Sequence, residues 1–304
     1  MPYHSYDFPD SSGVVSQSRT STIVHDRRST TSEAILGWLR MFTLSPKITP
    51  VKLDKWLASI WLIVNAKNGI SSWVLSRSIG VTQKTAWFML HRIRRILETD
   101  DSDRLLSGVV EGDETYIGGK AEFMHKSDKD RKLKGGRGTA GKGKVQGFTE
   151  RGGEVRARVI PNELPSTFHA HIRECVEPGS TIYTDQHSSY DGLGPDYTHD
   201  FVVHRQEYVR GVVHTNTIEG FWCLLKRMLK GTYVAVDQYH LNRYVSEEVF
   251  RYNLRKENDL VRFLVAVGKT LGKRLSYKEL IGVRKTPRRG GPRKSMEIAN
   301  AAQA

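Results

Sequence analysis

Between residues 105 and 203 the sequence carries strand-like runs in an order that few folds accommodate. A first strand is predicted within 105–119, where β-branched and aromatic residues gather before a pair of glycines. A hairpin is predicted next, because the runs 145–150 and 154–160 flank a Gly152-Gly153 turn. The connection 120–144 is a glycine-rich loop with nine basic and three acidic residues, a composition that cannot pack a core.

Helices and shorter strands complete this part of the chain. The expected elements are a helix over 164–176, a strand over 180–184, a short strand over 201–203, and helices over about 216–229 and 238–255. Strands interleaved with helices in this way predict an α/β domain.

Three acidic residues stand out against this pattern. Asp113 lies inside an otherwise apolar strand, where a charged group is costly unless it is paired or binds a metal. Asp185 directly follows the strand at 180–184, and Glu219 lies on a helix 34 positions further on. Acids on two strands and a later helix are typical of an RNase H-like fold, in which a mixed sheet brings the aspartates together. The predicted fold class is therefore an RNase H-like mixed-sheet catalytic core, preceded by a helical domain.

Phosphodiester chemistry explains why three such groups would occur together. Mg²⁺ or Mn²⁺ takes oxygen ligands, and Mg²⁺ needs only one or two carboxylates per ion. Two ions about 4 Å apart can activate an attacking oxygen and stabilise a leaving one. We therefore predict Asp113, Asp185 and Glu219 as metal ligands. On the helix of Glu219, Asn216 is either a further ligand or the N-cap, and Lys226 is predicted to contact a phosphate oxygen.

Histidine and cysteine offer a competing metal site. Six histidines lie in the same region: His169, His171, His187, His199, His204 and His214. None forms an HExxH motif or has a cysteine partner, so a zinc hydrolase is disfavoured. His187 and His214 are expected near the acids. The two cysteines, Cys175 and Cys223, lack metal-type spacing and are expected to be free thiols in a reducing compartment. Cys223 and Trp222 are both expected in the core.

A helix-turn-helix is predicted upstream, over 51–99. Apolar residues recur at helical spacing from Leu53, Ser71 or Ser72 can cap a second helix, and Thr82 can cap a third after a turn at Gly80. The third helix is expected to place Ala86, Leu90, Ile93 and Leu97 in the core. The residues expected to face DNA are Gln83, Lys84, Thr85, Arg92, Arg94 and Arg95.

Charge divides the chain in a way that suits a polyanionic ligand. The segment 51–99 carries a net +6 and the segment 255–294 a net +10, whereas 100–254 carries −2. The predicted organisation is a disordered or diverged segment at 1–50, the helix-turn-helix at 51–99, the catalytic core at 104–255 and a basic extension at 256–304. No apolar run reaches the length of a membrane span, so no membrane partner is expected.

Three sequence blocks resemble the ISXO-like insertion-sequence transposases, which belong to the DDE class. They are EGDETYIGGK at 111–120, YTD at 183–185 and HTNTIEGFWCLLKR at 214–227, and the segments 75–81 and 84–94 resemble the family's helix-turn-helix. The resemblance implies that Asp113 and Asp185 are the two catalytic aspartates. It places the third ligand at Glu219 or Asn216, followed by Lys226. Of these two we predict Glu219.

The resemblance also implies an activity and its setting. The expected protein is a DNA transposase that cleaves element ends and transfers strands into target DNA. Its expected partner is double-stranded DNA, on which it forms a homo-oligomer, in the bacterial cytoplasm at the nucleoid. Family members usually begin with a four-cysteine zinc ribbon, yet no cysteine precedes residue 175, so no zinc is expected. The alternatives are an inactive or domesticated DNA-binding protein, which would bind without cleaving, and an RNase H-like nuclease, which would cleave without joining.

Overall fold

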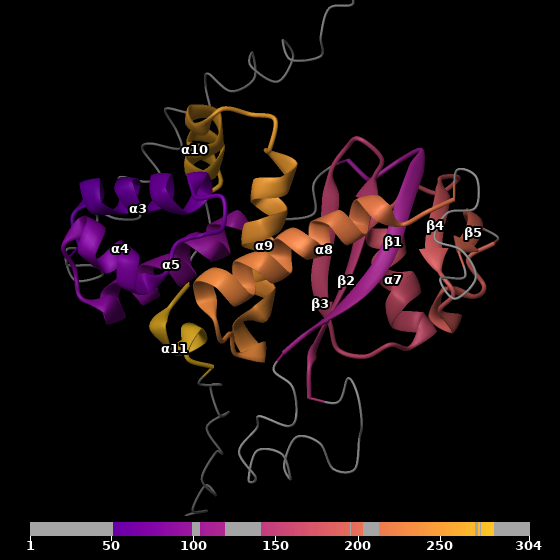
Figure 1. Ribbon diagram of the computed structural model, residues 1–304, viewed down its shortest axis with the longest axis horizontal. Coiled ribbons are helices and arrows are strands. Elements are labelled where there is room, and N and C mark those ends of the chain that lie inside the picture. The colour runs from indigo at the N-terminus through magenta and orange to yellow at the C-terminus, as the bar shows by residue number, and fades with distance from the viewer. Residues whose placement is uncertain are drawn as a thin grey trace, which may run out of the picture.

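The computed structural model describes residues 51–98, 104–118, 141–194, 196–202, 213–270, 273 and 275–282. A helical unit and a sheet-based unit lie side by side (Figure 1). The predicted N-terminal segment, most of the predicted basic loop and the end of the chain beyond 282 lie outside the described residues.

A five-stranded mixed sheet forms the centre of the larger unit. Its strands are β1 (Val109–Ile117), β2 (Gly143–Glu150), β3 (Val155–Ile160), β4 (Thr181–Asp185) and β5 (Thr198–Val202), in the order β3-β2-β1-β4-β5. β2 is antiparallel to both of its neighbours, β1 and β3, whereas β4 runs parallel to β1 and β5 parallel to β4. The strand order and directions confirm the predicted RNase H-like mixed sheet.

Alternation of side chains along the strands gives the sheet two apolar faces. Val110 and Phe148 pack on one face with Ile172 of α7 (Pro165–Cys175). On the other face, residues such as Val145 pack against α8 (Asn216–Met228) and α9 (Gln238–Asn253). Figure 1 shows α7 behind the sheet and α8 across its front. Short elements complete this unit: η2 (Ser188–Tyr190) follows β4, and a π-helical turn, η3 (Leu229–Tyr233), follows α8.

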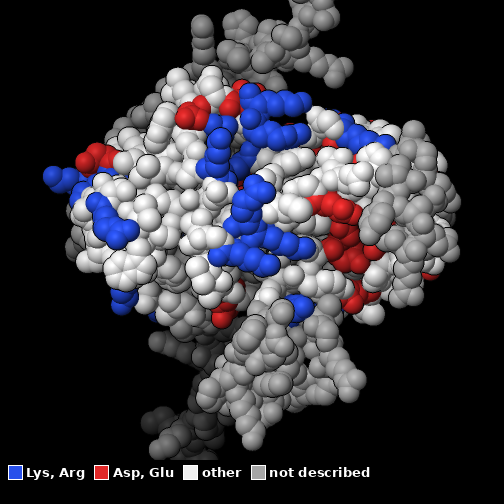
Figure 2. All heavy atoms as spheres, in the orientation of Figure 1, with Lys and Arg blue, Asp and Glu red and all other residues white. Residues whose placement is uncertain are grey.

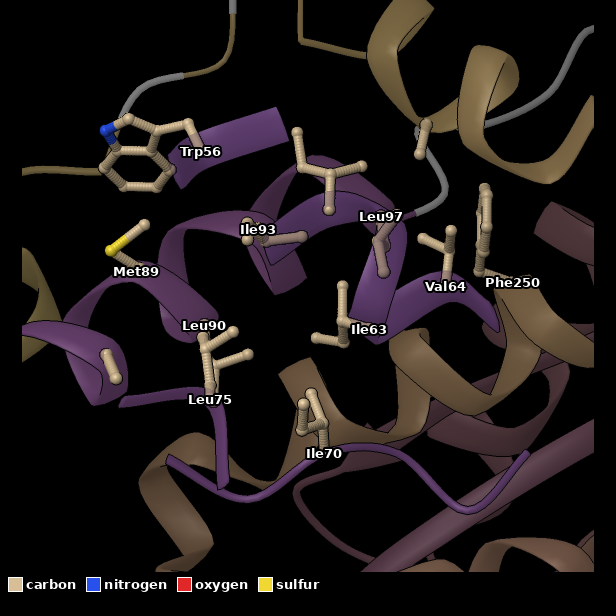
Figure 3. Packing of buried hydrophobic residues seen from close by; sticks show 13 residues of the cluster. Trp56, Ile63, Val64, Ile70, Leu75, Met89, Leu90, Ile93, Leu97 and Phe250 are labelled. Atoms are coloured by element: carbon tan, nitrogen blue, oxygen red, sulfur yellow. The ribbon is translucent and has the colours of Figure 1, made fainter. Parts of the chain in front are cut away.

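The helical unit contains the three helices expected from the sequence. They are α3 (Leu53–Asn65), α4 (Ser72–Ile79) and α5 (Gln83–Leu97). Ser71 and Thr82 cap α4 and α5 by accepting hydrogen bonds from backbone N–H groups, and Gly80 takes a left-handed conformation between the two helices. The four predicted core residues of α5 are all buried. Figure 3 shows this core, in which Leu90, Ile93 and Leu97 meet Ile63 and Val64.

The C-terminal part of the chain returns to this helical unit. A further helix, α10 (Asp259–Gly268), packs on α3, and its Ala266 lies in the same core. A short helix, α11 (Tyr277–Leu280), follows. The sequence predicts a basic extension over 256–304. The described part of that segment contains α10 and α11 and adds them to the unit formed by 51–98.

Buried charges join the two units. Arg94 of α5 donates a 2.7 Å hydrogen bond to Glu247 of α9, and the side chains of both are almost fully buried. Arg251 pairs with Glu247 as well, and Phe250 of α9 enters the core of the helical unit. The prediction that Arg94 faces DNA is therefore wrong, because its guanidinium group is held inside the protein by a carboxylate that the sequence places 153 residues away.

No helix in the described ranges is long and apolar enough to cross a membrane.

Candidate metal centre

Asp113 and Asp185 meet where two parallel strands separate. The last paired residues of β1 and β4 are Glu111 and Tyr183. Asp113 and Asp185 each lie two residues further along, so they face each other across the point of divergence. In RNase H-like sheets and other open α/β sheets, this edge is where ligands meet the carboxyl ends of the strands.

Carboxylate oxygens of three residues gather at this point. Asp113, Glu114 and Asp185 each offer an oxygen within 4.8 Å of the other two. Such a set suits a hard divalent cation, which prefers several oxygen ligands. Figure 2 shows Asp and Glu side chains concentrated in this part of the molecular face.

The carboxylates of this cluster repel one another, and their pKa values reflect it. Burial, followed by the charge of Asp185 and, to a smaller extent, that of Glu219, raises the pKa of Asp113 to about 7. Burial, followed by the charges of Asp185 and Asp113, raises the pKa of Glu114 to about 8. A bound divalent cation would relieve this repulsion, so the donor set and its charge both fit a metal site.

Glu114 was not among the predicted site residues. As the next residue along the strand it points to the opposite face of the sheet from Asp113, and its carboxylate accepts a 3.2 Å hydrogen bond from the Tyr190 hydroxyl. His187 Nε2 lies 3.6 Å from the same carboxylate. Because β1 and β4 separate here, the longer glutamate side chain still brings one oxygen close to the aspartates. The only sequence signal for it is its position beside Asp113.

Trp222 of α8 fixes the orientation of Asp113. Its indole N–H donates a 2.8 Å hydrogen bond to Asp113 Oδ2, so this buried tryptophan is more than the core residue expected from the sequence. The ring lies over Gly147, which pairs with Asp113 in the β1–β2 ladder. A Cβ at Gly147 would lie 2.6 Å from the Trp222 ring, so the absence of a side chain there makes room for the tryptophan.

Alanine at Gly147 is therefore expected to destabilise the protein by about 1–3 kcal/mol, because the indole must move or the sheet must shift. Urea denaturation measures the change. Gly194→Ala is the control, since a Cβ there meets nothing within 4 Å and its change should stay near zero. Equal stability of the two variants would contradict the contact between Gly147 and Trp222.

Glu111 anchors the start of α8 to β1. Its buried carboxylate accepts hydrogen bonds from the backbone N–H groups of Thr217 and Ile218, at 2.8 and 3.2 Å, where the positive end of the helix dipole favours a negative charge. Arg151 donates a 2.8 Å hydrogen bond to the same carboxylate, and His214 Nδ1 lies 3.2 Å from it. Glu111 thus performs the capping role for which Asn216 was one candidate.

The structure does not bring the predicted residues of α8 into the group of three carboxylates. Glu219 and Asn216 are exposed, and Lys226 is partly exposed. Glu219 is not in the group of three carboxylates, yet its charge is close enough to act on Asp113. The expectation that Cys223 is a core residue is wrong, because the thiol is exposed. His187 and His214 lie beside different acids, Glu114 and Glu111.

On α5 the remaining predicted DNA contacts differ in accessibility. Lys84 and Arg95 are exposed, and Thr85 is partly exposed. Gln83 donates a hydrogen bond to Ser72. Arg92 packs over the Phe88 ring and donates to the backbone carbonyl of Leu275, so part of its hydrogen-bonding capacity is already used.

Comparison with known proteins places this chain in a family. The model of the ISXO2-like transposase domain matches residues 105–253. An uncharacterized protein in transposable element ISH50 of Halobacterium salinarum is 32% identical over 217 residues, which are 66% of this chain and 71% of that protein. An uncharacterized transposase-like protein of Haemophilus influenzae is 32% identical over 101 residues, covering 33% of this chain and 81% of that protein.

A solved structure, the crystal structure of the Mos1 strand transfer complex, is a more distant match. It is 13% identical with a TM-score of 0.23, and the match covers 72% of this chain and 79% of that one. The family model spans the strands of Asp113 and Asp185 and the helix of Glu219, and the Halobacterium protein matches over most of its own length. The chain therefore belongs to the ISXO2-like transposase family.

Proposed function

We propose that this protein is the transposase of an insertion sequence and that it cleaves DNA at element ends and transfers the freed strand into target DNA. The main observation behind this proposal is that the carboxylates of Asp113 and Asp185 lie close together where β1 and β4 separate. Membership of the ISXO2-like family supports it.

In this proposal Asp113, Asp185 and Glu219 hold Mg²⁺ or Mn²⁺, and Glu114 joins them as a further carboxylate. The bound metal would supply Lewis-acid activation of a water or hydroxyl and neutralise charge on the phosphodiester. Trp222 keeps one oxygen of Asp113 in place and so orients this carboxylate within the cluster. Lys226 and Asn216, on the same helix as Glu219, are assigned to the substrate side, where Lys226 contacts a phosphate oxygen as a point charge.

DNA recognition is assigned to the helical unit. The α4–α5 pair, with its turn at Gly80, supports a helix-turn-helix whose second helix enters the major groove. The exposed Lys84 and Arg95, together with Thr85, are the proposed contacts, and Gln83 and Arg92 contribute only if they leave their present partners. Assembly as a homo-oligomer on double-stranded DNA belongs to the same proposal.

The test is a cleavage and strand-transfer assay with DNA that carries the ends of the element. Wild-type protein should nick and join this DNA with Mg²⁺ or Mn²⁺ and not with EDTA, whereas Asp185→Asn should lose about three orders of magnitude in rate, since the metal loses a charged ligand. Asp196→Asn, an exposed aspartate on another surface, should retain activity. Full activity of Asp185→Asn would refute the assignment, and salt-sensitive binding without cleavage under either metal would favour a DNA-binding protein without catalysis.

A further inference from the structure

Uncompensated positive charge lies on the end of α8 and on the η3 turn that follows it. Arg227 and Lys230 are exposed, Lys226 is partly exposed, and none of the three pairs with a carboxylate in the part of the chain that the structure describes. Figure 2 shows Lys and Arg side chains gathered in the region of α8, next to a patch of Asp and Glu side chains. A polyanion would match this surface. The cations would neutralise the charge of the polyanion, and the reactive group of the polyanion would lie at the carboxylates.

The same surface of α8 contains a glycine that no contact among the described residues requires. Gly220 lies in the interior of the helix and is exposed, and a Cβ built on it meets nothing within 4 Å. Glycine at such a position destabilises a helix relative to alanine, because the unfolded chain has more conformations to lose. Close approach of another molecule's backbone is a physical reason for keeping a helix surface bare.

Helical spacing aligns these features. Residues three, four and seven positions apart share a helix face, so Gly220, Cys223 and Arg227 follow one another along the outside of α8. Glu219 adjoins Gly220 on the side of the metal centre, where Trp222 contacts Asp113. The rise from Gly220 to Arg227 is about 10 Å, so Arg227 lies about two turns beyond the bare position.

We propose that one DNA strand crosses the outer face of α8, with its sugar–phosphate backbone in contact with Gly220. Arg227 and Lys230 bind the phosphates on one side of this crossing, and the carboxylates hold the reactive phosphate on the other. This inference rests on the proposed function and adds the path by which the strand reaches the metal centre.

Alanine and leucine at Gly220 test the contact. Gly220→Ala should raise the Tm of the free protein by about 1–3 °C because alanine favours the helix. The same variant should cleave DNA about tenfold more slowly, and Gly220→Leu about a hundredfold, because the strand is displaced from the carboxylates. Gly268→Ala is the matched control: this glycine is also helical and exposed with open space around it, and its variant should keep wild-type cleavage.

Salt dependence of DNA binding tests the two cations without requiring cleavage. With a random-sequence DNA duplex in EDTA, Arg227→Gln and Lys230→Gln should each reduce the slope of log affinity against log salt by roughly one. Arg173→Gln, on α7 across the sheet, should leave the slope unchanged. An unchanged slope for both Arg227→Gln and Lys230→Gln would overturn the inference.

The two proposals fail in different ways. If wild-type protein cleaves DNA and both Gly220 variants cleave at the wild-type rate, the strand does not touch Gly220 and the inference is wrong while the transposase function stands. If wild-type protein does not cleave under either metal, the function fails, and the binding slopes still decide whether DNA lies on α8.

Discussion

Asparagine in place of Asp113 is expected to abolish metal-dependent DNA cleavage and, at pH 8, to stabilise the metal-free protein. The loss of activity follows because the cluster would keep only two of its three closely spaced carboxylates, and we expect a rate reduction of about three orders of magnitude or more. The gain in stability follows because asparagine removes a buried negative charge beside Asp185. It can still accept the hydrogen bond from Trp222.

The sign of the pH effect distinguishes this explanation from a general change in packing. The folded-state pKa of Asp113 is raised from 3.8 to about 7, so the folded protein holds this proton more tightly than the unfolded chain does. Stability from this group is complete below pH 3.8 and is lost as the pH rises through 7. The advantage of Asp113→Asn over wild type should therefore grow between pH 6 and pH 8, reaching about 1–3 kcal/mol.

Urea denaturation in EDTA at the two pH values measures this difference, and adding Mg²⁺ provides a second measurement. Mg²⁺ should stabilise wild-type protein more at pH 8 than at pH 6, because protons and metal compete for the same carboxylates, and it should have little effect on Asp113→Asn. Asp54→Asn, an exposed aspartate on α3, is the control and should behave as wild type. An Asp113→Asn variant less stable than wild type at pH 8 would show that the carboxylates do not repel one another.

Alanine in place of Arg94 is expected to lower the free energy of unfolding by about 3–5 kcal/mol. Arg94 and Glu247 are both buried, and the guanidinium group also lies over the rings of Tyr233 and Tyr244. Removing it leaves Glu247 in the interior with Arg251 as its remaining cationic partner and opens a cavity among the aromatic rings.

Chemical denaturation of Arg94→Ala and Arg95→Ala separates the buried pair from a surface one. Arg95 is the next residue on the same helix and pairs with Glu98 at the surface, so its replacement should change stability by less than about 1 kcal/mol. If Arg94→Ala lowered the free energy of unfolding as little as Arg95→Ala, the contact between the units would contribute little to stability.

Local patterns were sufficient to predict most of the elements. The caps at Ser71 and Thr82, the turn at Gly80 and the hairpin about Gly152-Gly153 lie where propensity and backbone geometry require them. Asp113 and Asp185 could be singled out because a charge in or directly after an apolar strand is conspicuous. Helix α10 was missed because the basic composition of the C-terminal segment outweighed its short apolar repeat.

Interactions between distant segments could not be predicted in this way. Nothing within α5 distinguishes Arg94, which is buried, from Arg95, which is exposed, because the difference depends on Glu247 in α9. Glu114 joins the carboxylate cluster only because β1 and β4 diverge after Glu111 and Tyr183, a property of the sheet and not of either strand. The hydrogen bond from Trp222 to Asp113 likewise requires the bare backbone at Gly147.

Helix α9 has a consequence for how such a protein can diverge. Through Phe250 and Glu247 it is part of the helical unit, and through Leu241 and Val245 it is part of the sheet unit. The two units therefore share a helix and cannot be exchanged as independent modules. A change in the packing of the helical unit must be matched on α9, and through α9 it reaches the side of the sheet that carries Asp113. Under the proposed function, the evolution of a new DNA specificity would therefore be coupled to maintenance of the sheet that carries the carboxylates.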